Sequence, residues 1–590
     1  MDKEFKSVLK DAKNDNIEAK IKVAEKYESE GKDKDAFRWY LDIASEDELP
    51  NIQVKVGDYY CQGEVVKQDY NKAYEWYSRA ADLDDCSAAY KLSALYKNGL
   101  GIEENKEMAF LWCDKAASLG CIEAMYDLGV MYRNGIGVKK NDEKSFLWFK
   151  KSADLGNVNA KVNVGYCYCN GIGVNTDSKE GVAWYNQAAE EGSATAFFNL
   201  GMCYKSGFGV DKDVYQAINC FEEAGKLGHG RAFYELGQLY ENEKSLKKSL
   251  GFALDCYQRA VNNGYLESSI ILAKHYFEKE ESKKALQWLE KCVENTEVQF
   301  ELGKYYYDGV YIEQNYLKAI KCFSEAAKKG NSKAQYYMGL VYYNGYGVRE
   351  DFDRAIECFK IAVENDSLEA TLLLAKIQEE LNKEDVNELL EKAAELNDAG
   401  AMYKLGYNYA HGKYCEKDME KAVSWYKKAS DLNNAQAQCN LALCYLNGDG
   451  IEQNYEFGVY WLERAVGGES VLALLNLGYC YLNGIGVSQN DDTALNYLLR
   501  AANKNNGPAK IAVARLYKNR DYEQAIYWYN QAICDCKDEA YIGIAEIYIC
   551  MNDENISKVR TLLNEVEDKT NEEYLKVIEL LEKYEKENEK

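Results

Sequence analysis

The chain has 590 residues, of which 47% are hydrophobic and 29% are charged, and its formal net charge is −25. A strongly acidic molecule repels phosphate groups, so nucleic acid and anionic membrane surfaces are excluded as expected partners. The sequence has no run of about 18 uncharged apolar residues, so we expect no membrane-spanning helix. Its first residues also lack the apolar stretch of a signal peptide.

The N-terminal residues predict a short cap helix. Phe5, Val8, Leu9 and Ala12 stand at helical spacing and form one apolar stripe on an otherwise polar segment. We therefore assign residues 1–15 to an N-terminal cap helix.

From residue 16 onward the sequence repeats. Trp76, Trp112, Trp148 and Trp184 are each 36 residues apart, and columns of leucine, glycine and tyrosine keep the same step. Within each unit, two apolar sets at helical spacing predict two short amphipathic helices. A unit of this size cannot bury its apolar face alone, so we expect one continuous solenoid over residues 16–570. The units, about 16 in number, start near residues 16, 49, 86, 121, 157, 193, 229, 265, 296, 331, 367, 398, 434, 470, 507 and 537.

A glycine-rich turn follows the first helix of most units. It reads NGIGV at 134–138, 170–174 and 483–487. A phosphate-binding loop would follow a strand and carry Gly-Lys-Ser/Thr, so we interpret the segment as a helix-to-helix turn whose glycine takes the left-handed conformation. Three shorter units lack this turn, and they start at residues 265, 367 and 507.

Two packing expectations follow from the repeat. Small residues such as Gly129 and Ala153 should let helices of neighbouring units approach closely. The tryptophan column should fill the remaining space, so that Trp148 is buried between its own unit and the next.

The last residues predict a second cap. Thr570 and Glu573 have the spacing of a capping box. Residues 571–590 then form a charged helix with one apolar stripe, so we assign them to a C-terminal capping helix. The stripe consists of Tyr574, Val577, Ile578, Leu581 and Tyr584.

Residues 124–156, AMYDLGVMYRNGIGVKKNDEKSFLWFKKSADLG, resemble the Sel-one-like repeat (SLR) family, the longer-turned relative of tetratricopeptide repeats. The resemblance rests on A-x-Y-x-L-G-x-x-Y, G-x-G-V and A-x-x-W-Y-x-x-A-A-x-x-G, and it covers almost the whole chain. It implies an all-α, right-handed superhelical solenoid of about 16 antiparallel helix pairs, in which the first helices line a concave surface. Relatives act as adaptors and scaffolds in protein degradation, signalling and host–microbe contact.

The 19 cysteines allow three interpretations. A secreted disulfide scaffold requires a signal peptide and paired cysteines in each unit, and the sequence shows neither. A metal site requires ligand pairs at zinc spacing, whereas the C-x-C pairs Cys167/Cys169 and Cys534/Cys536 point to different sides of a helix. Free buried thiols that act as small apolar residues are favoured, and they indicate a reducing, cytoplasmic location.

Catalytic chemistry has little support in the sequence. The chain has 3 histidines, His229, His275 and His411, and the sequence places no cysteine or serine partner near them. We expect no enzymatic activity, no cofactor and no bound metal.

Two columns of each first helix are candidates for a binding surface: the residue after the glycine (Val130 and its equivalents) and the residue after the tyrosine (Arg133 and its equivalents). Between residues 303 and 482 these columns become apolar and aromatic. Their side chains either pack neighbouring first helices together or form a groove for an apolar peptide or partner helix. The candidates are Tyr307, Leu340, Tyr343, Tyr407, Leu443, Leu446, Tyr479 and Leu482.

The sequence therefore favours a non-enzymatic interaction scaffold or adaptor that binds a partner protein or peptide in its concave groove. The alternative is a regulator, a sensor or inhibitor of a specific effector enzyme or toxin, built on the same solenoid. Because the molecule as a whole is acidic, we expect a partner whose apolar segment is flanked by basic residues.

Overall fold

The computed structural model describes residues 3–46, 48–242, 250–551 and 556–588, and these residues contain helices and turns but no β-strand. In chain order, the helices of the described residues are α1 (Lys3–Ala12), α2 (Ile17–Ser29), α3 (Asp33–Glu46), α4 (Pro50–Gln62), α5 (Tyr70–Asp82), α6 (Cys86–Asn98), α7 (Lys106–Ser118), α8 (Ile122–Asn134), α9 (Asp142–Asp154), α10 (Val158–Asn170), α11 (Ser178–Glu190), α12 (Ala194–Ser206), α13 (Val214–Lys226), α14 (Gly230–Asn242), α15 (Leu250–Asn262), α16 (Ser268–Glu278), α17 (Ser282–Lys291), α18 (Thr296–Asp308), α19 (Tyr316–Lys328), α20 (Ser332–Asn344), α21 (Phe352–Glu364), α22 (Leu368–Glu380), α23 (Val386–Glu395), α24 (Ala399–His411), α25 (Met419–Asp431), α26 (Ala435–Asn447), α27 (Tyr455–Gly467), α28 (Val471–Asn483), α29 (Asp491–Asn503), α30 (Gly507–Lys518), α31 (Tyr522–Ala532), α32 (Lys537–Met551), α33 (Ile556–Asn564) and α34 (Glu572–Asn588).

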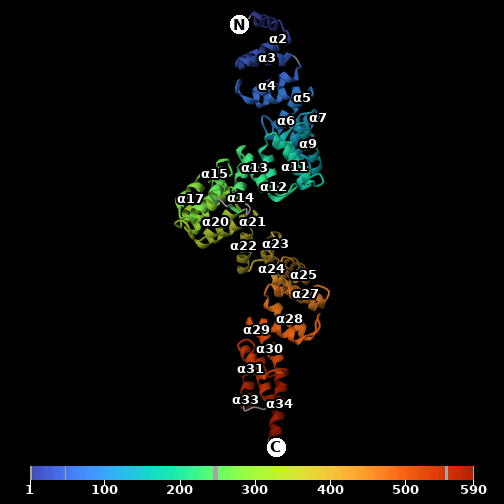
Figure 1. Cartoon of the computed structure of the whole chain (residues 1–590), viewed down its shortest axis with the longest axis vertical. Coiled ribbons are helices and arrows are strands. Elements are labelled where there is room, and N and C mark those ends of the chain that lie inside the picture. The colour runs from blue at the N-terminus through green and yellow to red at the C-terminus, as the bar shows by residue number, and fades with distance from the viewer. Residues whose placement is uncertain (1–2, 47, 243–249, 552–555, 589–590) are drawn as a thin grey trace. The chain divides into compact units, whose positions relative to one another are not determined.

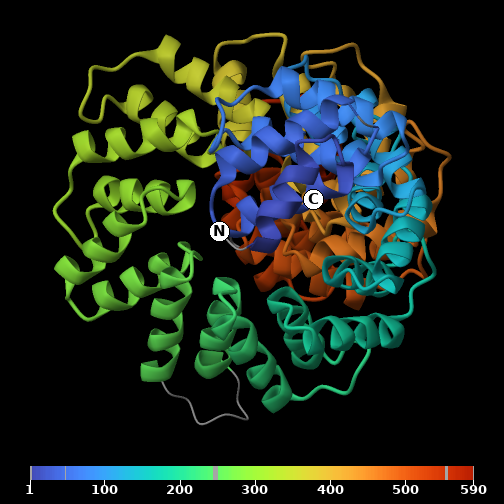
Figure 2. The same ribbon diagram turned by 90° about the horizontal axis from the view of Figure 1, so that it is seen from above.

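The helices from α2 to α33 follow one another as pairs, with an even-numbered first helix and an odd-numbered second helix. α8, for example, packs against α9, and α9 then packs against α10 of the next pair. In Figure 2 the teal-to-green pairs of the first half fan out side by side along a curve. The predicted all-α fold of stacked helix pairs is confirmed.

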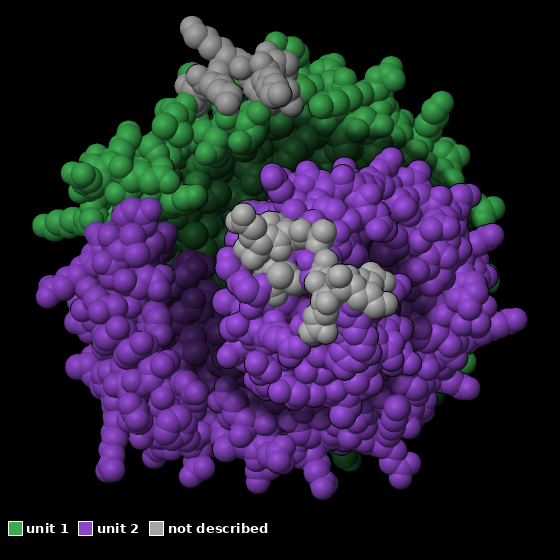
Figure 3. Space-filling model, turned by 90° about the horizontal axis from the view of Figure 1, so that it is seen from below, with its two compact units in different colours: residues 1–298 green, residues 299–590 purple. Residues whose placement is uncertain are grey.

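The chain divides into two compact units, Met1–Val298 and Gln299–Lys590. Each unit consists of stacked helix pairs (Figure 1), and Figure 3 colours the two units separately. A single continuous array over residues 16–570 stays a prediction. None of the described helices is long and apolar enough to cross a membrane.

The glycine-rich segment forms the predicted turn. Gly135 takes the left-handed conformation (φ 70°) directly after α8, and its N–H donates to the carbonyl of Met131. At the other end of the turn, Asn141 caps α9 by accepting a hydrogen bond from the backbone N–H of Lys144, at 2.9 Å. The backbone N–H of Asn141 in turn donates to the carbonyl of Tyr132, at 2.9 Å. These bonds satisfy backbone groups that the helix ends leave open, so no phosphate is needed to explain the turn.

The second glycine of the turn allows a close contact with the preceding helix pair. Gly137 also has a positive φ (66°), and a Cβ atom there would lie deep inside van der Waals contact with the carbonyl oxygen of Lys106. Gly173, one repeat later, stands in the same relation to the carbonyl of Asp142. The second glycine therefore lets each turn lie against the start of the second helix in the preceding pair.

The column that fills the core differs from the predicted one. Trp148 is only partly buried, and the ammonium group of Lys151 lies 4.0 Å from the centre of its ring. The next residue, Phe149, is fully buried. One helix step rotates a side chain by about 100°, so the two columns cannot face the core equally. The expectation that Trp148 is buried between units is wrong, although Trp76 and Trp184 of the same column are buried.

The glycine column of the first helix makes room for this ring. A Cβ atom at Gly129 would lie 2.7 Å from the ring of Phe149, and one at Gly165 would lie 2.8 Å from the ring of Tyr185. Each ring lies on the second helix of the same helix pair whose first helix carries the glycine. Gly129 therefore brings together the two helices of one unit, and not helices of neighbouring units as predicted.

The C-terminal cap starts differently from the prediction. The N-terminus of α34 is capped by Asn571, whose side-chain oxygen accepts from the N–H of Glu573 at 2.8 Å. The hydroxyl of Thr570 instead donates to Asp568, at 2.6 Å. The predicted capping box of Thr570 and Glu573 is therefore wrong, because the carboxylate of Glu573 binds Arg515 at 2.8 Å.

All 19 cysteines lie within the described residues as free thiols. Cys534 and Cys550 are exposed. Burial raises the pKa of Cys113 to about 12 and the pKa of Cys256 to about 12. Since only the thiolate reacts, a raised pKa means that little of either thiol is reactive near pH 8.

We expect iodoacetamide at pH 8 to alkylate Cys534 and Cys550 at least about a hundredfold faster than Cys113 and Cys256 in the folded protein. Peptide mass spectrometry over a time course measures the rates. After denaturation without reductant, all 19 cysteines should be modified. Cysteine pairs that stay unmodified until a reductant is added would show disulfides and contradict the assignment.

Candidate protein-binding face of the second unit

The eight predicted site residues all lie on first helices of the second unit. They come from α18, α20, α24, α26 and α28. None belongs to the fully buried core, and Tyr407 is 40% exposed. The structure nevertheless divides them into two groups with different surroundings.

Tyr307 lies within a cluster of aromatic rings. Its ring centre lies 5.3 Å from that of Tyr337 and 5.8 Å from that of Tyr346. Tyr346 stacks on Tyr316 with their ring centres 4.9 Å apart. Burial raises the pKa of Tyr307 to about 12. Tyr307 therefore packs the pair α18–α19 against the pair α20–α21.

Leu340 and Tyr343 on α20 also serve packing. Both are partly buried against the core that runs from α21 to α26. The ring of Tyr343 meets Phe352 edge to face, with the ring centres 5.4 Å apart. Like Tyr307, these side chains join neighbouring helices and leave only their outer parts to solvent.

The predicted apolar stretch is interrupted at α22. Lys376 and Glu379 occupy the two candidate columns there, since they stand six and nine residues after the buried Ala370, as Val130 and Arg133 stand after Ala124. The carboxylate of Glu379 lies 3.5 Å from the ammonium of Lys404 and 3.4 Å from that of Lys413. The expectation of one apolar surface from 303 to 482 is therefore wrong.

Beyond this interruption, five candidates remain on three successive first helices. We call Tyr407, Leu443, Leu446, Tyr479 and Leu482 the groove wall; they lie on α24, α26 and α28. α24 and α26 pack against each other directly.

Each of the three helices contributes a groove-wall side chain that packs against other residues of the fold. The ring of Tyr407 stacks on His411, with ring centres 4.0 Å apart. Leu446 covers Gly458 of α27, where a Cβ atom would lie 2.6 Å from the leucine side chain. Tyr479 packs against the core between α28 and α30, and burial raises its pKa. The groove wall is thus anchored in the fold while part of each side chain stays accessible.

Two cations continue the same columns on α30, and the sequence prediction missed them. Arg515 and Lys518 stand six and nine residues after the buried Ala509, as Tyr479 and Leu482 stand after Ala473. The repeat register alone would have placed them beside the groove wall. The sequence prediction considered only apolar and aromatic side chains in these columns and therefore missed both cations.

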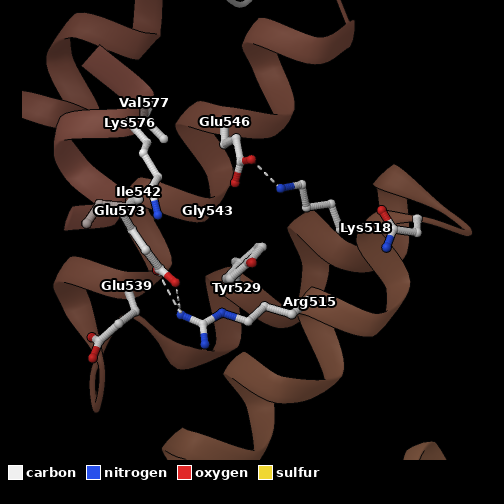
Figure 4. Close-up of a pocket in the computed structure, with 11 residues that line it drawn as sticks. Arg515, Lys518, Tyr529, Glu539, Ile542, Gly543, Glu546, Glu573, Lys576 and Val577 are labelled. Carbon is white, nitrogen blue, oxygen red and sulfur yellow. Dashed lines mark hydrogen bonds and ion pairs between the residues drawn. The ribbon is translucent and has the colours of Figure 1, made fainter. Parts of the chain in front are cut away.

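Both cations are paired in the structure (Figure 4). The guanidinium of Arg515 binds both carboxylate oxygens of Glu573 on α34, at 2.9 and 2.8 Å. The ammonium of Lys518 pairs with Glu546 on α32. Between the two ion pairs lies Tyr529, which is almost fully buried and whose pKa burial raises to about 12. These groups line a cavity of about 320 Å³ between α30, α32 and α34.

α34 packs mainly against α32 rather than against α33, its neighbour in sequence. Its buried residues Val577 and Leu581 join one apolar cluster with Ile542 and Ile549 of α32. An amphipathic helix of the chain itself, α34, therefore lies against α30 and α32, the first helices of the last two pairs.

Each of the three histidines lies against an aromatic ring, and His275 meets Tyr276 edge to face with ring centres 5.7 Å apart. His229 stacks on Phe198 with ring centres 4.5 Å apart, and burial lowers its pKa. His411 contacts Tyr407, as described. Among the described residues, no group of three or more His, Cys, Asp or Glu side chains is placed to hold a metal ion.

Paired helices, most of them 13 residues long, glycine turns between many of them and a face formed by first helices define an α-solenoid repeat protein. The Sel1 repeat profile matches more than half of the chain, so the chain belongs to the Sel1 repeat family. Such arrays generally mediate interactions between proteins. The matched segments are 52–85, 86–121, 122–157, 158–193, 195–229, 231–265, 296–331, 332–367, 387–398, 399–434, 435–466, 471–506 and 516–535.

No curated protein sequence matches the chain. Among solved structures, it is similar to a protective antigen of uropathogenic Escherichia coli with an SLR fold, at 24% identity over 86% of this chain and 96% of that one (TM-score 0.40). It is also similar to a Sel1 repeat protein from Oxalobacter formigenes, at 26% identity over 41% of this chain and 96% of that one (TM-score 0.38). An immunity protein from Pseudomonas aeruginosa is 20% identical over 37% of this chain and 83% of that one (TM-score 0.25).

Proposed function

We propose that the chain is a non-enzymatic interaction scaffold that binds a partner protein or peptide along the groove wall. The observation that carries this proposal is a row of partly exposed apolar side chains on three successive first helices, α24, α26 and α28. The core residue Phe149 is fully buried, whereas the side chains of the groove wall keep part of their apolar surface accessible. Apolar groups left accessible on neighbouring helices are typical of a surface that binds another chain.

The shape of the array supports the same proposal. First helices of consecutive pairs present equivalent positions side by side, so a long ligand meets the same kind of contact at each step. Tyr407 and Tyr479 lie two pairs apart, with Leu443 on the pair between them. An apolar helix or extended segment of a partner would therefore find aromatic anchors flanking a leucine surface.

Changing Tyr407 and Tyr479 together to alanine should weaken partner binding by about 2–4 kcal/mol, because aromatic anchors carry much of the binding energy of such surfaces. Capture from native lysate, followed by quantitative mass spectrometry and titration of each captured protein, measures the loss. Circular dichroism checks that the variant stays folded.

The matched control changes two tyrosines that lie on a second helix. Tyr455 and Tyr460 of α27 are 46% and 47% exposed. Changing both to alanine removes the same chemical groups from another face and should leave binding unchanged. If the groove variant keeps its partners, or if the control loses them equally, the groove wall is not the binding surface.

A further inference from the structure

The face that carries the groove wall does not end at Leu482. Arg515 on α30 and Glu546 on α32 stand six residues after the buried alanines Ala509 and Ala540, as Tyr479 stands after Ala473. α34 contacts this continuation directly, through the ion pair of Glu573 with Arg515 (Figure 4). A segment of the chain thus already occupies one end of the proposed binding face.

The contacts of α34 define what kind of ligand this end accepts. Val577 and Leu581 are four residues apart, so they share one side of the helix, and both are buried against α32. Glu573 lies four residues before Val577 on the same side and reaches Arg515. The occupant is therefore a helix with a carboxylate, an apolar residue and a second apolar residue at successive turns.

Much of α34 stays accessible to solvent, although Tyr574, Ile578 and Tyr584 pack, partly buried, against the cluster that holds Val577 and Leu581. Among its residues with described side chains, only Val577 and Leu581 are buried, whereas Leu575 and Leu580 are 49% and 40% exposed. Its two arginine pairs are open to solvent. Arg515 and Glu573 are 50% and 49% exposed, and Arg560, which binds Glu585, is 69% exposed. Exposed ion pairs contribute little to stability, so α34 is suited to being displaced.

Charge complementarity selects the ligand. The groove wall itself carries no charge, and Arg515 and Lys518 follow it in the same two columns. A partner helix that lies on Tyr479 and Leu482 and runs on towards α30 would bring a later turn to Arg515. A carboxylate on that turn would replace Glu573, whereas a basic side chain there would be repelled.

We propose that α34 is a tethered occupant of the binding face, and that the partner is an amphipathic helix with the same acidic-then-apolar pattern, which displaces it. This inference rests on the proposed function, because it places the partner on the surface that continues the groove wall. α34 then sets a threshold: a partner helix binds only when it competes successfully with the tethered one.

The probe for this competition is a fluorescent peptide with the sequence of residues 568–590. The receptor is the full chain carrying Val577→Asp and Leu581→Asp, which removes both apolar anchors of the tethered helix. The peptide should bind this released chain at least about tenfold more tightly than the unaltered chain, because the tethered helix no longer competes. Fluorescence anisotropy measures both affinities.

The matched control changes the exposed leucines of the same helix, Leu575→Asp and Leu580→Asp. This chain should bind the peptide as weakly as the unaltered chain does. Equal binding of the peptide to all three chains, or no binding to the released chain, would overturn the inference and leave α34 as a simple end cap.

A charge reversal tests the carboxylate separately. A peptide with Glu573→Arg should bind the released chain about three- to tenfold more weakly than the original peptide does, because the reversal replaces an exposed attraction by a repulsion. Its affinity should return when the released chain also carries Arg515→Glu.

If the released chain proves unfolded by circular dichroism, the full chain with Glu573→Arg alone replaces it. That chain should show faster hydrogen exchange across α34 and unchanged exchange across α28. Unchanged exchange in α34 counts against the inference.

The outcomes separate this inference from the proposed function. Partners lost by the Tyr407→Ala and Tyr479→Ala chain, together with a peptide that never binds, would support the groove wall and reject the role of α34. A peptide that binds the released chain and competes with the captured partners would support both.

Discussion

Replacing Phe149 with alanine should lower the local free energy of unfolding by about 3–5 kcal/mol. Phe149 is fully buried, its ring fills the space above Gly129, and the guanidinium of Arg133 lies 5.1 Å from its centre. Truncation removes contacts from both helices of one pair and leaves a cavity that α8 cannot close without moving. Because pairs in an array contact mainly their neighbours, the loss should appear as opening of α8–α11, measured by native-state hydrogen exchange.

The comparison with Trp148→Ala makes this prediction specific. Trp148 is partly buried, and Lys151 already shields one face of its ring from water. Its truncation should cost only about 1–2 kcal/mol, since less apolar area returns to solvent. An equal or larger opening in the Trp148 variant would mean that the tryptophan column, and not the next one, holds each pair together.

The repeat made most of the fold predictable from the sequence. A step of 36 residues and two apolar sets per step leave few alternatives to stacked helix pairs. Periodicity did not resolve which of two adjacent columns faces the core. Trp148 and Phe149 are both large and apolar, and only the packing against Gly129 distinguishes them. The cap of α34 was missed for a similar reason, because Asn571 and Thr570 are both good capping residues and Arg515 draws Glu573 away.

The candidate site was predictable in position but not in extent. The two columns identified by register do lie on the first helices of the second unit. Apolar character alone did not separate Tyr307, which is enclosed by other rings, from Tyr407, which is 40% exposed. It also passed over Lys376 and Arg515, whose charges divide the apolar stretch and end it.

Local charges also change the expected partner. The net charge of −25 suggests a basic ligand, because opposite charges attract at long range. At physiological ionic strength that attraction is screened beyond about 8 Å, so the residues in contact decide the preference. Beside the groove wall that residue is Arg515, which loses Glu573 when α34 is displaced and then favours an acidic turn on the partner helix. Lys518 stays paired with Glu546 of α32.

Changing Gly137 to alanine should weaken the junction between the pairs α6–α7 and α8–α9 by about 2–5 kcal/mol. The new Cβ would press into the carbonyl of Lys106, which is backbone and cannot turn away as a side chain would. Overpacking of this kind costs about 1–3 kcal/mol, and a positive φ costs an L-residue about 1–2 kcal/mol more. Hydrogen exchange should then show α6–α7 and α8–α9 opening independently, whereas in the unaltered chain we expect them to open together.

Gly135→Ala is the matched control, because it differs from Gly137→Ala in only one respect. Gly135 has nearly the same φ, 70°, but the nearest atom to a Cβ there lies 3.5 Å away. The control therefore carries the backbone strain without the clash and should cost about 1–2 kcal/mol. If both variants lose the same stability, Gly137 is needed only because of its positive φ, and the contact with Lys106 does not hold the pairs together. A larger loss at Gly137 alone would show that this glycine sets how closely consecutive repeats stack.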